Sequence, residues 1–298
     1  MNLIVRSSYS KIEDGSLKSN IGDLLRCTIL FNVRNELNNK ILTDKKGKEF
    51  LLNYLNEDAI LSINELKSHE YKTIYYLDNF DWCLTHLTQR YSNIIFKGFS
   101  FISEQFNANT NLLQTVAYNH IETNGLSWQE NLIRGVGLQW NKQDYLYPNV
   151  STSTTSFKVG LNHNVNWETK QWDLENWNEV YTFCKENQIS VSWQEGLDSL
   201  EDYINWIASC NIIITIEGLG LHIASSLKKQ ILLLSGPCES NEYSYNRIEK
   251  IYPNKKICMP CNREVCTHSD YKLSCLEEIT SYDVISVLKK YLEVKIWE

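Results

Sequence analysis

The sequence predicts an α/β protein with two parallel sheets, and three observations support this prediction. Short apolar strands alternate with amphipathic helices, which is the pattern of parallel strands joined by helical crossovers. A polar, Ser/Thr-rich stretch at 141–156 separates two halves that share this pattern. The chain has 298 residues, enough for two domains of ordinary size, and we expect them at 1–148 and 149–298.

The first half is expected to open with a buried strand and to continue in alternation. The segment 3–7 is expected to be a short first strand, and the polar segment 8–20 is expected to be a loop. A helix opens at Ile21, and the side chain of Asn20 is expected to cap it. The other expected elements are strands at 41–43, 73–77 and 93–96 and helices at 48–55 and 126–137.

The second half repeats the alternation. Ser199 is expected to cap one of its helices, because a serine hydroxyl can accept from a backbone N–H of the first turn. Only one short strand fits between the first two helices. The expected elements are strands at 157–161, 189–193, 211–216 and 230–235 and helices at 174–185, 199–209, 221–227 and 280–292.

The stretch 211–237 combines a buried strand, a glycine turn, a short helix and a second buried strand. Its turn is Glu217-Gly218-Leu219-Gly220. The backbone N–H groups from Gly218 to His222 should point out of a helix N-terminus at the carboxyl end of a strand. Open α/β sheets bind anionic ligands there, typically a phosphate. A purely structural crossover fits the same stretch equally well.

Composition excludes some classes of function. The net charge of −7 argues against a general nucleic-acid or membrane-surface binder. The N-terminal apolar segment is too short for a signal peptide, and no run approaches the roughly 18 apolar residues of a membrane span. We therefore expect a cytoplasmic protein, in which cysteines act as thiols or metal ligands and not as disulfides.

Four cysteines lie close together in the sequence. Cys258, Cys261, Cys266 and Cys275 have the spacing C-x(2)-C-x(4)-C-x(8)-C. Thiolates at this spacing can close a tetrahedral structural site for zinc or iron, and Cys238 is a possible fifth ligand. The alternative is a group of free or oxidisable thiols. The remaining cysteines are expected to be small core residues: Cys27, Cys83, Cys184 and Cys210.

Four motifs in order resemble the ADP-heptose heptosyltransferases, glycosyltransferase family nine, which have the GT-B fold. They are N-I-G-D-L-L-R-C-T at 20–28, T-K-Q-W-D-L-E-N-W at 169–177, I-E-G-L-G-L-H-I-A-S-S-L at 216–227, and the cysteine loop at 258–279. The resemblance implies two Rossmann-like domains whose parallel sheets face a cleft. The N-terminal domain would serve the acceptor, and the C-terminal domain would bind a nucleotide sugar.

The sequence departs from the family pattern at four places. Glu217-Gly218-Leu219 stands where Asp-Thr/Ser-Gly is usual, and Asp173 stands where proline is usual. The first loop is longer, and a strand–helix pair that helps to grip the nucleoside in relatives is missing. These departures concern mainly how the donor nucleotide is recognised.

The resemblance assigns chemistry to individual residues. Asp23 would be the base that deprotonates the acceptor hydroxyl during sugar transfer with inversion. The alternative is a carboxylate that stabilises the helix dipole. Lys170 would contact the donor phosphates, or be an ordinary surface lysine. His222 would donate to phosphate or ribose, or bond only to the backbone. No D-x-D motif is present, so no catalytic metal is expected.

Trp172 and Trp177 are expected to fix the helix that follows Lys170 to its sheet rather than to stack on a base. The expected function is transfer of a heptose or related sugar from a nucleoside diphosphate, with ADP expected, to the hydroxyl of a glycan, a protein or a small molecule. The alternative is a non-catalytic, metal-stapled protein of the same fold that binds a glycan or nucleotide.

Overall fold

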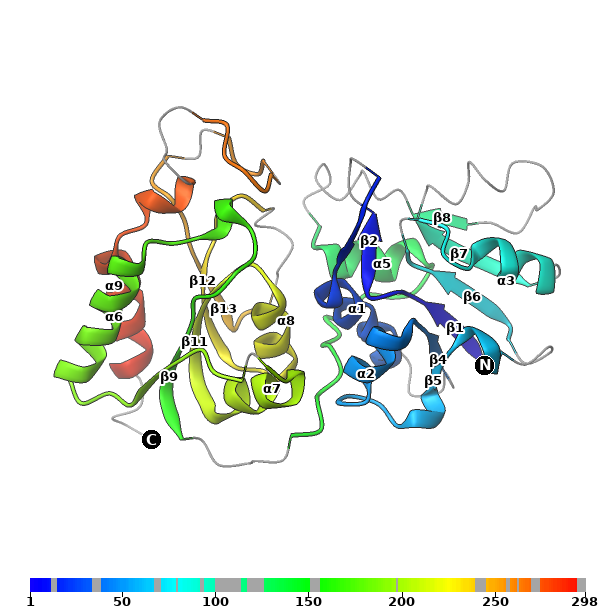
Figure 1. Cartoon of the computed structure of the whole chain (residues 1–298), viewed down its shortest axis with the longest axis horizontal. Helices are drawn as coiled ribbons and strands as arrows, with labels where there is room; N and C mark the ends of the chain where they lie inside the picture. The colour runs from blue at the N-terminus through cyan, green and yellow to red at the C-terminus, as the bar shows by residue number, and fades with distance from the viewer. Residues whose placement is uncertain are drawn as a thin grey trace. The chain divides into compact units, whose positions relative to one another are not determined.

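The chain divides into two compact units, Met1–Asn149 and Val150–Glu298 (Figure 1). The computed structural model describes residues 1–11, 15–33, 39–66, 71–78, 80–91, 94–99, 114–116, 126–150, 156–196, 198–238, 245–255, 258–261, 263–268 and 274–293. None of the helices in these ranges is both long enough and apolar enough to span a membrane. The expected boundary at 148–149 lies one residue from the division, and the roles given to the two halves stay predictions.

The first unit is built on a parallel sheet with the strand order β5-β4-β1-β6-β7-β8. Its central strand β1 is fully buried, which explains its continuous apolar sequence. The strands are β1 (Asn2–Val5), β4 (Asn39–Leu42), β5 (Ile60–Leu61), β6 (Thr73–Tyr76), β7 (Ile95–Phe99) and β8 (Gln114–Val116).

Helices pack on this sheet through apolar side chains. Leu84 and Leu87 belong to a buried cluster with Leu3, Val5 and Ile74 of the sheet. The helices are α1 (Ile21–Cys27), α2 (Lys45–Leu51), α3 (Leu84–Arg90) and α5 (Trp128–Gly135), with 3₁₀ turns at Thr28–Asn32, Glu57–Ala59 and Ile63–Glu65.

The predicted cap of α1 is confirmed, because the side chain of Asn20 accepts from the backbone N–H of Asp23. The predicted loop at 8–20 was wrong in part. It contains the antiparallel hairpin β2 (Tyr9–Lys11) and β3 (Leu17–Ser19). All three residues of β3 are exposed, so the segment lacks the apolar alternation by which a strand is recognised in sequence.

The second unit is built on a parallel sheet with the order β10-β9-β11-β12-β13. Four of these strands were predicted, whereas β13 was not, because its central residues Glu249 and Lys250 are charged and half-buried. The strands are β9 (Phe157–Asn162), β10 (Val191–Trp193), β11 (Cys210–Ile216), β12 (Gln230–Leu234) and β13 (Ile248–Ile251).

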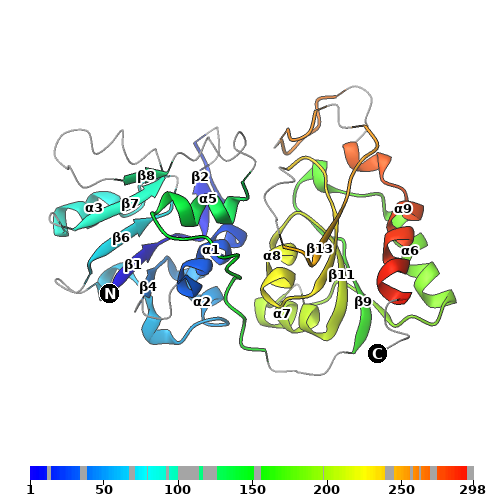
Figure 2. The same cartoon turned by 180° about the vertical axis from the view of Figure 1, so that it is seen from behind.

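Helices cover both faces of this sheet. Figures 1 and 2 show α6 (Leu174–Glu186) and α9 (Ser281–Glu293) together on one face. They also show α7 (Leu200–Ser209) and α8 (Leu219–Ser226) on the other face. The capping prediction for Ser199 is confirmed by its bond from the N–H of Asp202. Asp173, the residue that replaces proline, caps α6 by accepting from the N–H of Glu175.

Candidate functional site

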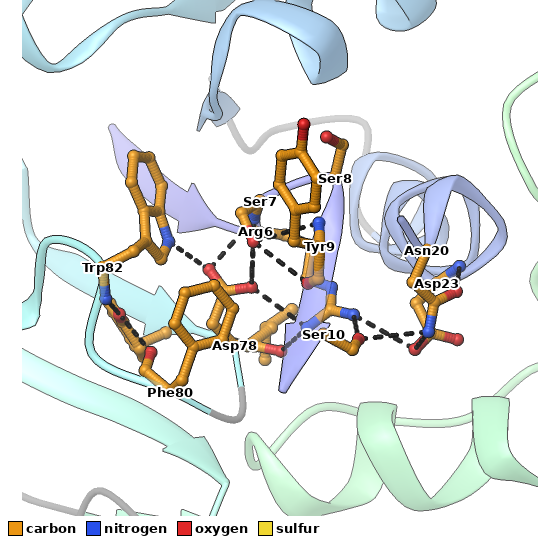
Figure 3. Close-up of polar contacts among 12 residues, drawn as sticks. Arg6, Ser7, Ser8, Tyr9, Ser10, Asn20, Asp23, Asp78, Phe80 and Trp82 are labelled. Carbon is orange, nitrogen blue, oxygen red and sulfur yellow. Dashed lines mark hydrogen bonds and ion pairs between the residues drawn. The ribbon is translucent and has the colours of Figure 1, made fainter. Parts of the chain in front are cut away.

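Charged side chains follow three neighbouring strands at the carboxyl edge of the first sheet. Arg6 comes directly after β1, Asp44 lies two residues after β4, and Asp78 lies two residues after β6. Because these strands are parallel neighbours, the three residues meet at one edge. Figure 3 shows the guanidinium group of Arg6 with Asp78 on one side and Asp23 of helix α1 on the other.

Asp23 lies in the first turn of α1, and its side chain is 15% exposed. Its Oδ2 accepts from Arg6 Nη2 at 3.1 Å and from Asn20 Nδ2 at 2.6 Å. Its Oδ1 accepts from Arg26 Nη1 at 2.7 Å. The carboxylate is therefore held in a defined orientation by two guanidinium groups. Its location agrees with the prediction, and its role as a base stays a prediction.

Asp78 is completely buried and accepts hydrogen bonds on both carboxylate oxygens. Its Oδ1 accepts from Arg6 Nη1 at 3.0 Å and from Ser7 Oγ at 2.8 Å. Its Oδ2 accepts from the Ser7 N–H at 2.9 Å and from the indole N–H of Trp82. Burial raises the pKa of Asp78 to about 6, and the charge of Arg6 opposes this rise.

Neither Arg6 nor Asp78 was among the predicted site residues. The sequence does carry a signal for them, because each is a charged residue within two positions of a buried parallel strand. Ligands of open α/β sheets bind outside the carboxyl ends of such strands. A search for charges at strand ends would have found both residues.

Predicted donor residues lie at the carboxyl edge of the second sheet. Glu217 follows β11 directly and is 2% exposed. Its Oε1 accepts from the Gly236 N–H at 3.1 Å and from Ser235 Oγ at 3.4 Å, whereas its Oε2 is buried without a hydrogen bond to any residue that the structure describes. Burial raises the pKa of Glu217, and the nearby positive charge of Lys170 opposes this effect. The structure thus brings two predicted residues together.

The two glycines of the turn have different surroundings. Gly218 is the N-cap of α8, and among the described residues a Cβ added there would meet nothing closer than Val165 Cγ1 at 3.9 Å. A Cβ added at Gly220 would lie 2.3 Å from Asn162 Nδ2 and 2.4 Å from Tyr203 Oη. Gly220 is therefore needed for packing, whereas a Cβ at Gly218 would make only an ordinary van der Waals contact among the described residues.

The other two predicted donor residues at this edge lie on α8. Leu219 is its first residue and is half-buried, whereas His222 is 5% exposed within the helix. His222 donates its backbone N–H to the Gly218 carbonyl at 3.5 Å. The predicted role of its side chain in donor binding stays a prediction.

Lys170 ends a 3₁₀ turn, Glu168–Lys170, between β9 and α6. Its ammonium lies 4.1 Å from the ring centroid of Trp167, a cation–π contact. The preceding Thr169 donates its N–H to the Glu264 carbonyl at 3.2 Å and its hydroxyl to the Arg263 carbonyl at 2.5 Å. The position of Lys170 thus depends on the cysteine loop.

The prediction for Trp172 and Trp177 is confirmed. Both indoles are buried in the apolar cluster that joins α6 and α9 to the sheet, and their rings meet edge to face at 4.9 Å. The indole N–H of Trp172 donates to the Ile279 carbonyl at 2.7 Å.

The four cysteines of the predicted metal site lie near one another. Cys258, Cys261 and Cys266 line a pocket of about 380 Å³ together with Arg263 and His268, among others. Burial raises the pKa of Cys258, and the neighbouring thiols Cys261 and Cys266 add to the rise.

Cys275 is 4% exposed, and its pKa is raised to about 12. Burial is the main cause, and the charges of Cys258 and Cys261 add to it. Within the described ranges, however, no group of three or more His, Cys, Asp or Glu side chains is arranged to hold a metal ion. The donor types suit zinc or iron. The structure therefore shows a cluster of thiols without a formed coordination shell.

The four cysteines that were predicted to be core residues are indeed buried, and so is Cys238. Cys238 lies two residues after Gly236, whose backbone N–H bonds Glu217. In addition, the Cys261 N–H donates to the Pro237 carbonyl at 2.9 Å. The cysteine loop is thus attached to the edge of the sheet that carries Glu217.

No protein-family profile matches the chain. Among curated proteins, it is similar to lipooligosaccharide heptosyltransferase 2 of Campylobacter jejuni, with 27% identity over 115 residues. This match covers 38% of the chain and 36% of the relative, so the chain matches about a third of the relative's length. The sequence similarity agrees with the resemblance to heptosyltransferases.

Solved structures share the fold over nearly the whole chain. A glycosyl transferase of family 9 from Veillonella parvula has a TM-score of 0.71 and 14% identity, with 99% of this chain and 97% of that chain covered. The dodecameric iron-containing heptosyltransferase TibC, in complex with ADP-D-β-D-heptose, has a TM-score of 0.62 and 12% identity, with 98% and 76% covered. The chain therefore has the α/β fold of the GT-B type, as predicted.

Proposed function

We propose that this chain is an inverting glycosyltransferase that moves a heptose or related sugar from a nucleoside diphosphate to an acceptor hydroxyl. The observation that carries the proposal is the fold, shared over 99% of the chain with a family 9 glycosyl transferase. The polar groups at the carboxyl edges of both sheets support it, since ligands of open α/β sheets bind at such edges.

The diphosphate of the donor is proposed to bind at the turn before α8. Gly218 has no side chain to cap the helix, and the only described atom near a Cβ there is Val165 Cγ1 at 3.9 Å, so the first backbone N–H groups of α8 can donate to phosphate oxygens. Lys170 adds a positive charge near Glu217, where it opposes the rise in the pKa of that carboxyl. Donors and a cation aimed at the leaving diphosphate lower the barrier, because negative charge grows there during transfer.

Asp23 is proposed to be the general base. The acceptor oxygen forms a bond to the anomeric carbon while the bond from that carbon to the diphosphate oxygen breaks. The proton of the acceptor hydroxyl passes to a carboxylate oxygen of Asp23, and the nucleoside diphosphate leaves with the bonding electrons. Attack opposite the leaving group inverts the anomeric configuration. The hydrogen bonds to Asp23 fix the carboxylate for this transfer.

ADP-heptose is the proposed donor, because the chain shares the fold of TibC, which has been solved with ADP-D-β-D-heptose. The acceptor is a hydroxyl of a glycan, a protein or a small molecule. A cytoplasmic location, where activated nucleotide sugars are made, is part of the same proposal.

Transfer and slow hydrolysis of ADP-heptose by purified protein test the proposal. We expect release of ADP that Asp23→Asn reduces by about 10²- to 10⁴-fold, the usual contribution of a general base. Asp283→Asn is the matched control, because Asp283 is also a first-turn carboxylate, in α9. Binding of ADP-heptose without any ADP release, with or without acceptors, would favour the non-catalytic alternative.

A structural zinc or iron ion on Cys258, Cys261, Cys266 and Cys275 is a further part of the proposal. Cys258, Cys261 and Cys266 line one pocket, and TibC is an iron-containing protein of the same fold. A metal held by thiolates would order the loop that positions Lys170. It would supply no chemistry to the transfer step.

A further inference from the structure

Asp78 has no part in the proposed chemistry, yet it is the most completely surrounded carboxylate of the described first unit. It is 0% exposed and accepts from Arg6, from the hydroxyl and N–H of Ser7, and from Trp82. A buried charge is costly unless it is paired and hydrogen-bonded. Such an arrangement so near the proposed base requires an explanation.

Arg6 joins the buried carboxylate to the proposed base. One end of its guanidinium, Nη1, donates to Asp78 Oδ1 and to the Leu77 carbonyl, both at 3.0 Å. The other end, Nη2, donates to Asp23 Oδ2 at 3.1 Å and to Ser10 Oγ at 2.8 Å. The guanidinium is planar, and its donors keep a fixed angle to one another. Fixing Nη1 on Asp78 therefore sets where Nη2 meets Asp23.

We propose that Asp78 is a positioning residue for the proposed base: through Arg6 it orients the carboxylate of Asp23 and neutralises one of the two cations beside it. This inference rests on the proposed function. Asp23 itself takes the proton, while Asp78 acts only through the guanidinium that both carboxylates share.

The charges of the four groups explain why the neutralisation matters. Arg6 and Arg26 both pair with Asp23, so two cations and one anion meet at the proposed base. Asp78 adds a second anion, which pairs with Arg6 on the side away from Asp23. When Asp78 is protonated or replaced by a neutral residue, Arg6 loses the anionic partner that it shares with no other group of these four, and its positive charge acts more strongly on Asp23. That charge favours the anionic form of Asp23 and opposes its uptake of a proton in the transition state.

The fall of the transfer rate on the acid side of the pH–rate profile should then follow the protonation of Asp78. Burial raises the pKa of Asp78 to about 6, so its protonation should slow transfer as the pH falls below about 6. Burial also raises the pKa of the neighbouring thiols Cys27 and Cys83 and of the phenol of Tyr76, so these groups stay neutral across this range. Two other carboxylates lie near these groups. Asp81 accepts from the Leu84 N–H at the start of α3, and Asp44 accepts from Ser8 Oγ at 2.9 Å.

Two variants separate positioning from simple stabilisation. Asp78→Asn keeps the shape but removes the charge, and we expect kcat to fall about 10- to 100-fold with the KM for donor unchanged. The decline of rate near pH 6 should disappear from its profile. Trp82→Phe removes one donor to the Asp78 carboxylate, so the decline should move to higher pH while the full rate returns at alkaline pH. Asp81→Asn is the control and should leave the profile unchanged.

A measurement that does not depend on enzyme activity tests this inference separately from the proposed function. The ¹⁵Nη signals of Arg6 should show slow rotation of the guanidinium in the parent protein and faster rotation in Asp78→Asn. Equal rotation in both, or an Asp78→Asn enzyme with the parent's kcat and pH profile, would overturn the inference. If Asp78→Asn does not fold, an unchanged profile in Trp82→Phe overturns it. A parent protein with fixed Arg6 but no transfer activity would contradict the proposed function alone.

Discussion

Replacing Gly220 by alanine should destabilise the second unit without involving any ligand. The new Cβ would lie 2.3 Å from Asn162 Nδ2 and 2.4 Å from Tyr203 Oη, whereas ordinary contacts begin at 3.4 Å. Asn162 donates to Thr215 Oγ1 at 2.7 Å and accepts from Tyr203 Oη at 2.5 Å, so it cannot move without breaking buried hydrogen bonds.

The magnitude follows from three contributions. Overpacking costs about 1–3 kcal/mol. Loss of the bonds on Asn162 adds about 1 kcal/mol each. The higher helix propensity of alanine over glycine offsets about 1 kcal/mol. We therefore expect the free energy of unfolding to fall by about 2–4 kcal/mol, which lowers the urea midpoint by roughly 1–2 M at the usual slope for small domains.

Gly218→Ala is the matched control, because a Cβ there would meet only Val165 Cγ1 at 3.9 Å among the described residues. Its stability should fall by no more than about 0.5–1 kcal/mol, since alanine is a poor N-cap. Affinity for ADP should nevertheless fall if the diphosphate approaches the Gly218 backbone. Urea unfolding followed by tryptophan fluorescence measures the first quantity, and calorimetry with ADP the second. A Gly220→Ala protein as stable as the parent would refute the packing argument, and unchanged ADP affinity in Gly218→Ala would refute the proposed diphosphate position.

Two further predictions concern the loops beside this turn. Lys170→Ala should lower the affinity for ADP by about 10- to 100-fold, as expected for the loss of a charge-assisted contact. The affinity for adenosine should stay nearly unchanged. Calorimetry with both ligands checks this, and an equal loss for the two would mean that Lys170 acts on structure only. The double variant Cys258→Ser, Cys261→Ser should lose the one equivalent of zinc or iron that elemental analysis is expected to find in the parent protein. Parent protein free of metal, with thiols that react fully, would contradict the metal proposal.

The sequence predicted secondary structure best where the segment is buried, because burial requires apolar residues. Strands β1 and β11 are buried over nearly their whole length, so continuous apolar runs identified them. Strands β3 and β13 escaped prediction because their residues are exposed or charged, and pairing with a neighbouring strand is what makes them strands. Propensity is a weak guide where tertiary pairing decides.

The kinds of local structure at the candidate site could be predicted from the sequence, but the contacts between its residues could not. The turn at Glu217 and the helix start at Asp23 have local signatures of glycines and capping residues. The bonds from Arg6 to Asp23 and Asp78 join residues that are 17 and 72 positions apart. Such contacts follow from strand order, which a single sequence does not reveal. The packing role of Gly220 likewise depends on Asn162 and Tyr203, which come from other elements.

The hydrogen bonds between Thr169 and the cysteine loop influence the order in which parts of the chain fold during synthesis. Thr169 Oγ1 bonds a carbonyl 94 residues further along the chain, and Trp172 Nε1 bonds one 107 residues further along. A nascent chain can pair β9, β11 and β12 while these partners are still untranslated. Contacts of such long sequence separation form late, because closing long loops costs entropy. During synthesis, the segment around Lys170 is therefore expected to become ordered only after the ribosome has passed Ile279.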